Sequence, residues 1–368
     1  MARIAIVLNT SWNVWNFRLP LLHALERAGH EIIVIAPHDE YVGRIPFPCH
    51  HVDIRSRSTN PFVDMMTIWG FFRVFQRLRP DIALLYTVKP NVYGNLAAKI
   101  LGIKTISNVA GLGAVFIHKS LVTLLVKKLY RASLRVPSRV FFQNQDDLSL
   151  FLEEKIVCEE CVGKIPGSGV DLVRFKPVQL PKNELFVFLL PSRMLWDKGV
   201  REYVDAAHLL LKERYAVEFR LMGFLDVDNP EAVSKSDMDG LTNIQGLVYA
   251  GVSDQIEEDL AKADCVVLPS YREGTPRALL EAAAMAKPII TTDAVGCRDV
   301  VDDGVSGFLC KVADTGDLYK KMKKMLQLSA VERLEMGLQG RRKMEREFDQ
   351  EIVIASYEQA VADILAEK

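Results

Sequence analysis

Long hydrophobic runs are absent from this 368-residue sequence. No uninterrupted stretch of about 18 apolar residues occurs, so the sequence contains no candidate transmembrane helix. The apolar run at residues 4–8 is too short for the core of a secretory signal, and polar residues follow it at once. We therefore interpret it as a first β-strand.

Cysteine is scarce as well, and its spacing predicts no metal site. Of the six cysteines, only Cys158 and Cys161 form a C-x-x-C pair, and neither a second pair nor a histidine lies nearby. Such a lone pair seldom binds zinc. We therefore expect reduced thiols in a cytoplasmic protein.

A strong net charge is also missing, since the formal value is −1 at pH 7. The sequence shows no basic–aromatic repeat of a nucleic-acid-binding module, so no nucleic-acid partner is expected. The charge is unevenly distributed, with more basic than acidic residues in 1–165 and the reverse in 166–368. We expect the first half to face something anionic.

Short apolar runs alternate with amphipathic stretches along the whole chain. This alternation predicts an α/β protein with two Rossmann-like, doubly wound domains that face a central cleft. A linker-like region at 154–184 separates the halves. Strands are expected at 3–9, 31–36, 81–87, 104–109, 139–143, 185–190, 217–222, 265–268, 288–292 and 307–310. Helices are expected at 17–28, 64–77, 92–101, 121–134, 146–153, 200–213, 253–263, 276–285, 318–326, 330–348 and 350–368.

The most informative stretch runs from Leu268 to Glu281, where a buried strand leads through a turn into an apolar helix. Thr275 suits the N-cap and Pro276 the first helical position, so the helix would offer backbone amides to a phosphate. Glu273 precedes this end of the helix, and Glu281 lies in its second turn. This spacing fits a diphosphate at the helix end, with one polyol beside Glu273 and another beside Glu281. A capped helix with two solvated acids is the alternative.

A second constellation follows the predicted strand 185–190. Arg193 and Lys198 lie in a loop at the carboxyl end of that strand, and ligands of such sheets bind at these ends. Two fixed cations there could hold a diphosphate against the helix that begins near Pro276. A surface loop with incidental charges is the alternative.

In the first half, the loops at 9–16, 87–93 and 108–116 follow predicted strands. The first loop lacks the Gly-x-Gly-x-x-Gly fingerprint, which argues against a dinucleotide cofactor. Polar groups of this loop could bind a sugar, Lys89 could meet an anionic acceptor, and glycines in the third loop allow close backbone approach. The candidate residues are Asn16, Arg18, Lys89, Gly111 and Gly113.

Residues 115–139 form an apolar and basic stretch without any acidic residue. This pattern is typical of an amphipathic helix on an anionic membrane surface. Residues 71–79 could add to it. A core helix with a basic outer face is the alternative. The basic residues are Lys119, Lys127, Lys128, Arg131, Arg135 and Arg139.

The combination of Arg193 and Lys198 with Glu273 and Glu281 resembles the retaining glycosyltransferases of family 4, which have the GT-B fold. The resemblance extends over nearly the whole chain and is most specific at 191–199 and 268–309. It implies an acceptor-binding domain at 1–165 and a nucleotide-sugar-binding domain at 166–350. It also implies a C-terminal helix at 351–368 that packs back on the first domain.

Within this family, residues 17–20 and 196–199 are similar to bacterial enzymes that extend undecaprenyl-diphosphate-linked sugars in N-glycosylation. The resemblance implies transfer of N-acetylgalactosamine from a UDP-sugar to a polyprenyl-diphosphate-linked acceptor such as diacetylbacillosamine. It further implies no metal or other cofactor, a peripheral position on the inner face of the cytoplasmic membrane, and other glycan-assembly enzymes as partners.

The resemblance also assigns roles to the site residues. Arg193 and Lys198 would bind the donor diphosphate, Glu281 the ribose, and Glu273 the transferred sugar. Another UDP-sugar in capsule or O-antigen synthesis, an epimerase on the same fold and a non-catalytic nucleotide-sugar sensor are the alternatives. Further donor-site candidates are Gly274, Thr275, Pro276, Leu279 and Leu280.

Overall fold

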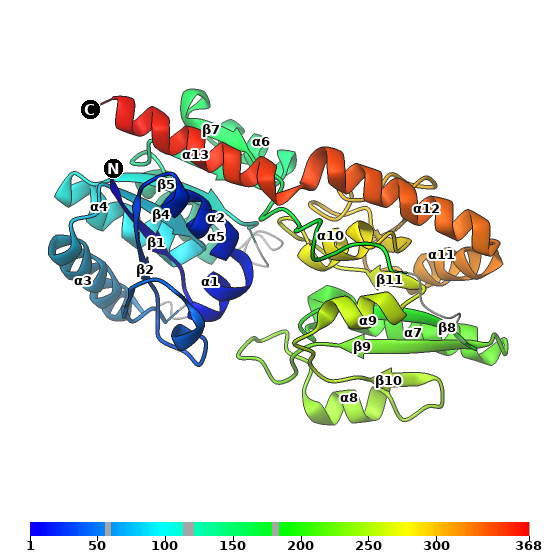
Figure 1. The fold of residues 1–368 in the computed structure, drawn as a ribbon. Coiled ribbons are helices and arrows are strands. Elements are labelled where there is room, and N and C mark those ends of the chain that lie inside the picture. The colour runs from blue at the N-terminus through cyan, green and yellow to red at the C-terminus, as the bar shows by residue number, and fades with distance from the viewer. Residues whose placement is uncertain (56–59, 113–120, 179–183, 368) are drawn as a thin grey trace. The chain divides into compact units, whose positions relative to one another are not determined.

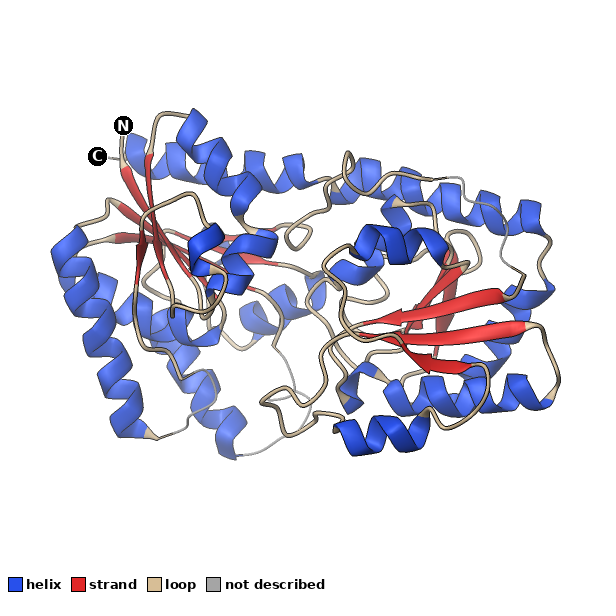
Figure 2. Ribbon diagram, turned by 60° about the horizontal axis from the view of Figure 1, so that its bottom comes forward, coloured by secondary structure: helices blue, strands red, loops and turns tan. Residues whose placement is uncertain are grey.

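The computed structural model describes residues 1–55, 60–112, 121–178 and 184–367. The chain forms two compact units (Figure 1). The first contains Met1–Ser168 together with Glu351–Lys368, and the second contains Gly169–Gln350. Each unit has one parallel β-sheet with helices on both faces (Figure 2). The predicted pair of Rossmann-like α/β domains is confirmed.

The first sheet has the strand order β3-β2-β1-β4-β5-β6-β7. Its central strands are continuous apolar runs because helices cover them on both sides. The order reverses between β1 and β4, and ligands of doubly wound sheets bind at such a switch point. The strands are β1 (Arg3–Val7), β2 (Glu31–Ile35), β3 (Cys49–His50), β4 (Ile82–Tyr86), β5 (Lys104–Val109), β6 (Arg139–Phe142) and β7 (Val162–Lys164).

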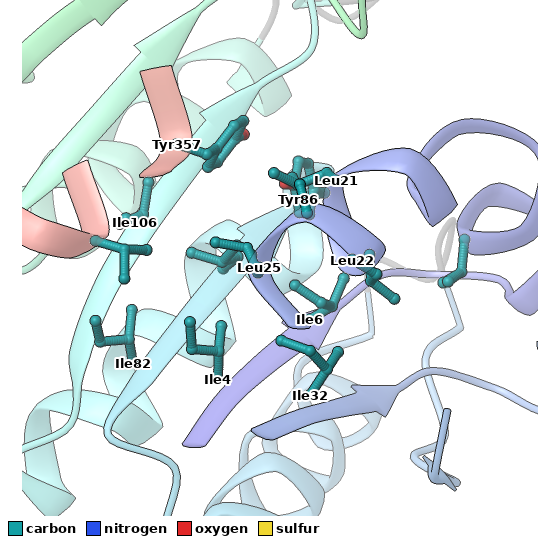
Figure 3. Close-up of a cluster of buried hydrophobic side chains, with 14 of the residues drawn as sticks. Ile4, Ile6, Leu21, Leu22, Leu25, Ile32, Ile82, Tyr86, Ile106 and Tyr357 are labelled. Carbon is teal, nitrogen blue, oxygen red and sulfur yellow. The ribbon is translucent and has the colours of Figure 1, made fainter. Parts of the chain in front are cut away.

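Two apolar clusters lie on the two faces of this sheet. One joins the sheet to α2 and α13, and Figure 3 shows Ile4, Leu25 and Tyr357 from these elements around one core. The other joins it to α3, α4, α5 and α6. Helix α13 therefore packs on the first unit. The helices are α1 (Ser11–Phe17), α2 (Leu19–Arg27), α3 (Pro61–Leu78), α4 (Asn95–Leu101), α5 (Leu121–Ser133), α6 (Gln145–Glu153) and α13 (Gln350–Ala366).

Two local predictions for the first half are wrong. The expected loop 9–16 is mostly helix α1, because the Thr10 hydroxyl caps it by accepting the amide of Asn13 at 3.1 Å. Ser11 and Val14 lie on the buried side of this helix. The linker-like region also contributes an edge strand, β7, and Gly163 in that strand lets Phe141 pack closely.

The second sheet has the strand order β10-β9-β8-β11-β12-β13, which reverses between β8 and β11. Apolar side chains again form one cluster on each face. The strands are β8 (Phe186–Pro191), β9 (Val217–Met222), β10 (Leu247–Tyr249), β11 (Cys265–Leu268), β12 (Ile289–Thr292) and β13 (Gly307–Cys310). The helices are α7 (Val200–Lys212), α8 (Lys235–Leu241), α9 (Ile256–Lys262), α10 (Arg277–Ala284), α11 (Thr315–Gln327) and α12 (Ala330–Lys343).

Helix α8 was not expected from the sequence, although it has a clear start signal. Ser234 and Asp237 form a reciprocal capping box at its N-terminus. Its short apolar face, of which Met238 is buried, explains why periodicity did not reveal it. Among the described residues, no helix is both long and apolar enough to cross a membrane.

Candidate active site

Two loops meet at the switch point of the second sheet. Strands β8 and β11 are parallel neighbours, so the segments after them, 192–199 and 269–276, leave the same edge. The amide of Tyr271 donates to the carbonyl of Asp197 at 2.9 Å and links the two loops. Gly199 has φ +75°, and a Cβ there would lie 2.3 Å from the carbonyl oxygen of Pro269. Only glycine allows this close approach.

The linked loops bring Lys198 and Glu273 together. Lys198 Nζ lies 2.6 Å from Glu273 Oε1, and the Ser270 hydroxyl donates to the same oxygen at 2.8 Å. The two charged side chains are 13% and 17% exposed. Neither contact engages Oε2, so that oxygen can accept a hydrogen bond from a ligand hydroxyl. The contact with Ser270 had not been anticipated from the sequence.

A third loop, which follows β12, fixes the backbone of Glu273. The amide of Glu273 donates to the carbonyl of Val295 at 3.0 Å. Gly296 has φ +78°, and a Cβ would lie 2.3 Å from the carbonyl oxygen of Gly274. Gly274 is itself buried in this contact. The loop therefore positions the acid through its main chain, which no side-chain motif could reveal.

Arg193 differs from Lys198 in its surroundings. It follows β8, is exposed, and its guanidinium takes part in none of the hydrogen bonds or ion pairs found among the described residues. Behind it, Gly223 approaches the carbonyl of Ser192 so closely that a Cβ would lie 1.7 Å from the oxygen. The backbone of this loop thus packs against Gly223, while the Arg193 guanidinium is exposed and can bind an anion.

Helix α10 starts one residue later than predicted. Pro276, not Thr275, is its N-cap, with φ −73° and ψ 105° and no side-chain hydrogen bond to the helix. The proline ring fixes φ and leaves the backbone extended at this point, so the first helical residue is Arg277. The positive end of the helix dipole is therefore not covered by a side-chain cap.

Leu279 and Leu280, which were predicted as ligand contacts, have buried side chains. Both are fully buried in the apolar cluster beneath α10. Their amides donate to the carbonyl of Pro276 at 3.0 and 3.3 Å. Apolar side chains in the first turns of a helix that covers a sheet face the core, so these two leucines help to position the helix.

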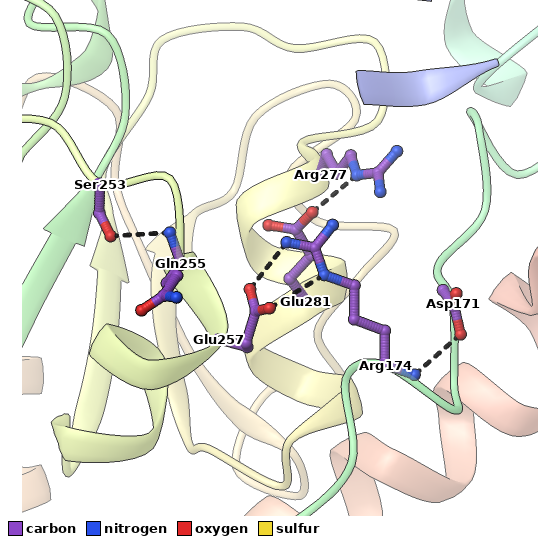
Figure 4. Close-up of polar contacts among 7 residues, drawn as sticks. All are labelled: Asp171, Arg174, Ser253, Gln255, Glu257, Arg277 and Glu281. Carbon is purple, nitrogen blue, oxygen red and sulfur yellow. Dashed lines mark hydrogen bonds and ion pairs between the residues drawn. The ribbon is translucent and has the colours of Figure 1, made fainter. Parts of the chain in front are cut away.

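Glu281 lies in a network of charges (Figure 4). Arg277 Nε donates to Glu281 Oε1 at 2.7 Å. Nearby, Arg174 forms an ion pair with Glu257 at 2.8 Å. Burial raises the pKa of Glu281 above its ordinary value of 4.5, and the charges of Arg277 and Arg174 oppose this shift. Arg174 and Glu257 belong to segments without a recognisable motif, so neither could be predicted from the sequence.

In the first unit, Arg18 lies at the other switch point. It is buried, and its guanidinium stacks over the ring of Tyr86, the last residue of β4, at 4.2 Å from the ring centroid. Such a contact holds a cation in place without neutralising it. Thr87, the next residue, has φ +65°, a strained conformation for a β-branched side chain that often marks a functional site. Its conformation could not be foreseen from the sequence.

Two other predicted residues of the first unit, Lys89 and Asn16, already bind neighbouring groups. Lys89 Nζ lies 2.6 Å from Asp64 Oδ1, and its side chain is 9% exposed. The Asn16 amide donates to the carbonyl of Trp12 within α1. Gly111 adopts φ +98°, which suits a close backbone approach. Gly113 lies outside the described residues.

Comparison with known proteins identifies the family to which the chain belongs. Two family profiles match it, one described as a glycosyl transferase 4-like domain over residues 14–157 and one as glycosyl transferases group 1 over residues 186–328. The N,N'-diacetylbacillosaminyl-diphospho-undecaprenol alpha-1,3-N-acetylgalactosaminyltransferase of Campylobacter jejuni is 30% identical over 349 residues, which cover 88% of this chain and 89% of that protein. The chain belongs to the group 1 glycosyltransferases.

Other similarities agree with this assignment. The glycosyltransferase is 24% identical to the capsular polysaccharide biosynthesis glycosyltransferase CapM of Staphylococcus aureus, over 82% of each chain. The crystal structure of Anabaena Alr3699/HepE in complex with UDP-glucose matches it with a TM-score of 0.79 at 17% identity, over 100% of both chains. The expected GT-B fold is thus confirmed.

The glycosyltransferase site contains an ion pair between Lys198 and Glu273, and Ser270 donates to the same acid. The described residues contain no group of three or more histidines, cysteines, aspartates or glutamates that could hold a metal ion. Cys297, next to Gly296, does not supply a thiolate, because burial raises its pKa to about 12. Lys198, Glu273 and Glu281 all belong to the segment matched by the group 1 profile.

The described part of the basic stretch belongs mainly to helix α5. Residues 115–120 lie outside the described part. In α5, Leu129 and Tyr130 pack in the core, while Lys127 forms an ion pair with Glu154 at 2.8 Å. Tertiary packing thus uses the apolar face of this helix. Of its cations, Lys128 is exposed, whereas Lys127 and Arg131 donate to Glu154.

Proposed function

We propose that this glycosyltransferase moves N-acetylgalactosamine from UDP-N-acetylgalactosamine, with retention of configuration, to an undecaprenyl-diphosphate-linked saccharide such as diacetylbacillosamine. The observation that carries the proposal is Glu273, held by Lys198 and Ser270 at the switch point of the second sheet. It occurs in a chain 30% identical to a transferase whose name states this sugar and this acceptor.

The second unit is proposed to bind the donor. Arg193 and Lys198 bind the diphosphate, and the uncapped end of α10, with Thr275 and Pro276, adds the positive pole of its dipole. An ammonium group has three donors, so Lys198 can hold Glu273 and a phosphate oxygen together. Arg277 holds one oxygen of Glu281, which leaves the other for the ribose hydroxyls.

We propose the following transfer step. The acceptor hydroxyl attacks the anomeric carbon on the face from which UDP leaves. The bond from this carbon to the phosphate oxygen breaks, the bond to the acceptor oxygen forms, and the hydroxyl proton passes to the leaving phosphate. Arg193 and Lys198 stabilise the negative charge that develops there, without a metal ion. Glu273 Oε2 accepts a hydrogen bond from a hydroxyl of the transferred sugar and faces the positive charge that develops on the sugar ring.

The first unit is proposed to bind the acceptor, with Arg18 and Lys89 near its switch point and Gly111 in a neighbouring loop. Because the acceptor is anchored in lipid, we place the enzyme on the inner face of the cytoplasmic membrane, where other glycan-assembly enzymes supply its acceptor and use its product. The basic excess of residues 1–165 supports a position beside anionic lipid.

The decisive experiment offers a panel of UDP-sugars to the purified protein with a short-chain polyprenyl-diphosphate-linked diacetylbacillosamine. Mass spectrometry identifies the transferred sugar, and the proton coupling constant at the new anomeric centre reports its configuration. We expect an α-linked N-acetylgalactosamine and equal turnover in the presence of a chelator. Absence of transfer, an inverted product or a chelator-sensitive rate would contradict the proposal.

A second candidate function is transfer of another UDP-sugar in capsule or O-antigen synthesis. The similarity to the capsular transferase of Staphylococcus aureus over 82% of the chain supports it. In the same panel, preference for a different UDP-sugar, or for an acceptor without diacetylbacillosamine, would favour this function.

A further inference from the structure

Helix α3 of the first unit exposes large apolar side chains to solvent. Phe62, Met65, Met66 and Trp69 are 76%, 64%, 73% and 59% exposed. Their spacing places them on one face of the helix. The opposite face, with Phe71 and Phe75, is buried in the core, so these outward residues are not needed for folding. Helices on protein surfaces normally present polar residues there.

The apolar surface extends beyond the helix. Trp69 stacks on Phe72 with ring centroids 5.5 Å apart, and Ile100 at the end of the adjacent α4 is 69% exposed. A shallow depression between them is lined only by apolar and sulfur-containing side chains. We call Phe62, Met65, Met66, Trp69 and Ile100 the apolar face. Contiguous surfaces of this kind mark interaction sites.

Arginines adjoin the apolar face. Arg73 and Arg77 lie one and two turns further along the same side of α3 and are exposed. Together with Arg55 they line a cavity that also reaches Met66. In the described parts of the chain, no hydrogen bond or ion pair engages these three guanidinium groups.

Acidic residues do not balance this charge. Asp64, the sole acid of α3, is directed to Lys89 at 2.6 Å. Asp53 at the rim of the cavity contacts His51. The helix therefore presents an apolar half followed by a cationic half on one side, and an exposed lysine, Lys99, lies next to Ile100.

We infer that the apolar face and its arginines dock this glycosyltransferase on a membrane with anionic headgroups. Trp and Met side chains would enter the interface, while the arginines would contact lipid phosphates, and stable attachment of a peripheral protein requires two such signals. A second copy of the chain fits less well, because α3 offers the arginines no free acidic partner, since its one acid, Asp64, is held by Lys89. The inference rests on the proposed lipid-linked acceptor, and it locates the membrane contact on α3 rather than at 115–139.

The test is co-sedimentation of the full-length protein with vesicles of phosphatidylcholine, with or without phosphatidylglycerol. One variant, Met65→Ser with Trp69→Ser, removes apolar contacts, and another, Arg73→Glu with Arg77→Glu, reverses charge. The matched control, Lys128→Glu with Arg135→Glu, reverses two exposed cations in the basic stretch. We expect each α3 variant to lower partitioning to anionic vesicles by about tenfold or more, and the control to change it little.

Three outcomes would overturn the inference. Loss of binding in the control but not in the α3 variants would return the contact to residues 115–139. If the wild-type protein does not bind vesicles, the surface is not a lipid contact. If it forms a concentration-dependent dimer that the Met65→Ser, Trp69→Ser variant does not form, the surface is a contact between two copies. Circular dichroism and undiminished transfer to a water-soluble, short-chain acceptor show that the variants fold. Vesicle binding without transfer from any UDP-sugar would refute the proposed function and leave this inference intact.

Discussion

Replacing Lys198 with alanine separates the catalytic role of its charge from its structural role. The substitution removes an ammonium group 2.6 Å from Glu273 Oε1, and Glu273 then keeps only the hydrogen bond from Ser270 at 2.8 Å. If Lys198 also stabilises the leaving diphosphate, two losses occur together: one in the transition state and one in the folded state.

The structure sets the size of both losses. Removing one preorganised donor at a developing charge typically raises the barrier by about 3 kcal/mol, so we expect kcat to fall by about a hundredfold or more. The carboxylate of Glu273, 17% exposed, loses its charged partner but not its hydroxyl donor. The free energy of unfolding should therefore fall by about 1–3 kcal/mol, the usual cost of a buried group that loses a partner.

Product formation from UDP-N-acetylgalactosamine measures the first loss, and urea unfolding the second. Adding Glu273→Gln to Lys198→Ala removes the uncompensated carboxylate, so the double variant should regain stability but not activity. Lys323→Ala serves as the control, since it removes an exposed ion pair with Glu213 at 2.7 Å and should leave turnover unchanged. Near-normal turnover of a folded Lys198→Ala variant, or activity regained in the double variant, would refute this reasoning.

Three further predictions concern acidity and backbone space. Burial raises the pKa of Glu281 above 4.5. The affinity for UDP, measured by calorimetry, should therefore fall as the pH decreases toward that pKa, because the protonated acid binds the ribose less well. The Glu281→Gln variant should lose this pH dependence. Burial lowers the pKa of His30 below 6.5 in the folded protein, so the unfolded chain binds the proton more tightly. The melting temperature should therefore fall as the pH drops through 6.5, and it should fall less in the His30→Gln variant. Gly296→Ala should reduce activity by displacing Glu273, whereas Gly304→Ala, with φ +77° and open space, should cost stability alone.

Much of the fold could be predicted because its strands are short runs with buried apolar residues between helical stretches. The predicted bounds of β5, β9, β11 and β13 agree with the structure. Strand β11 is apolar throughout because both of its faces are buried, whereas β9 alternates buried apolar residues with the partly exposed Glu218 and Arg220. Helix α1 was missed because its sequence has no helical periodicity, and its start depends on one side-chain cap, Thr10. Strand β3 spans only two residues and has no pattern of its own.

The candidate site was predictable where it depends on topology and unpredictable where it depends on tertiary contacts. Lys198 and Glu273 were expected to converge because their loops follow strands of one predicted sheet, and the structure pairs these two strands. The position of Arg174 near Glu281 is set by how a distant loop packs on the second unit, which no spacing in the sequence encodes. The burial of Leu279 likewise depends on the direction of α10 against the sheet.

The charges of the donor site divide into two classes with different consequences. Lys198 is paired with Glu273 and Arg277 with Glu281, so these acids are oriented before a ligand arrives. Their remaining oxygens can accept sugar and ribose hydroxyls without reorganisation, which is the preorganisation that lowers a barrier. Arg193 is exposed and has no acidic partner among the described residues, so its charge can meet the diphosphate first. Loss of Arg193 should therefore weaken donor binding, whereas loss of Lys198 should act mainly on turnover.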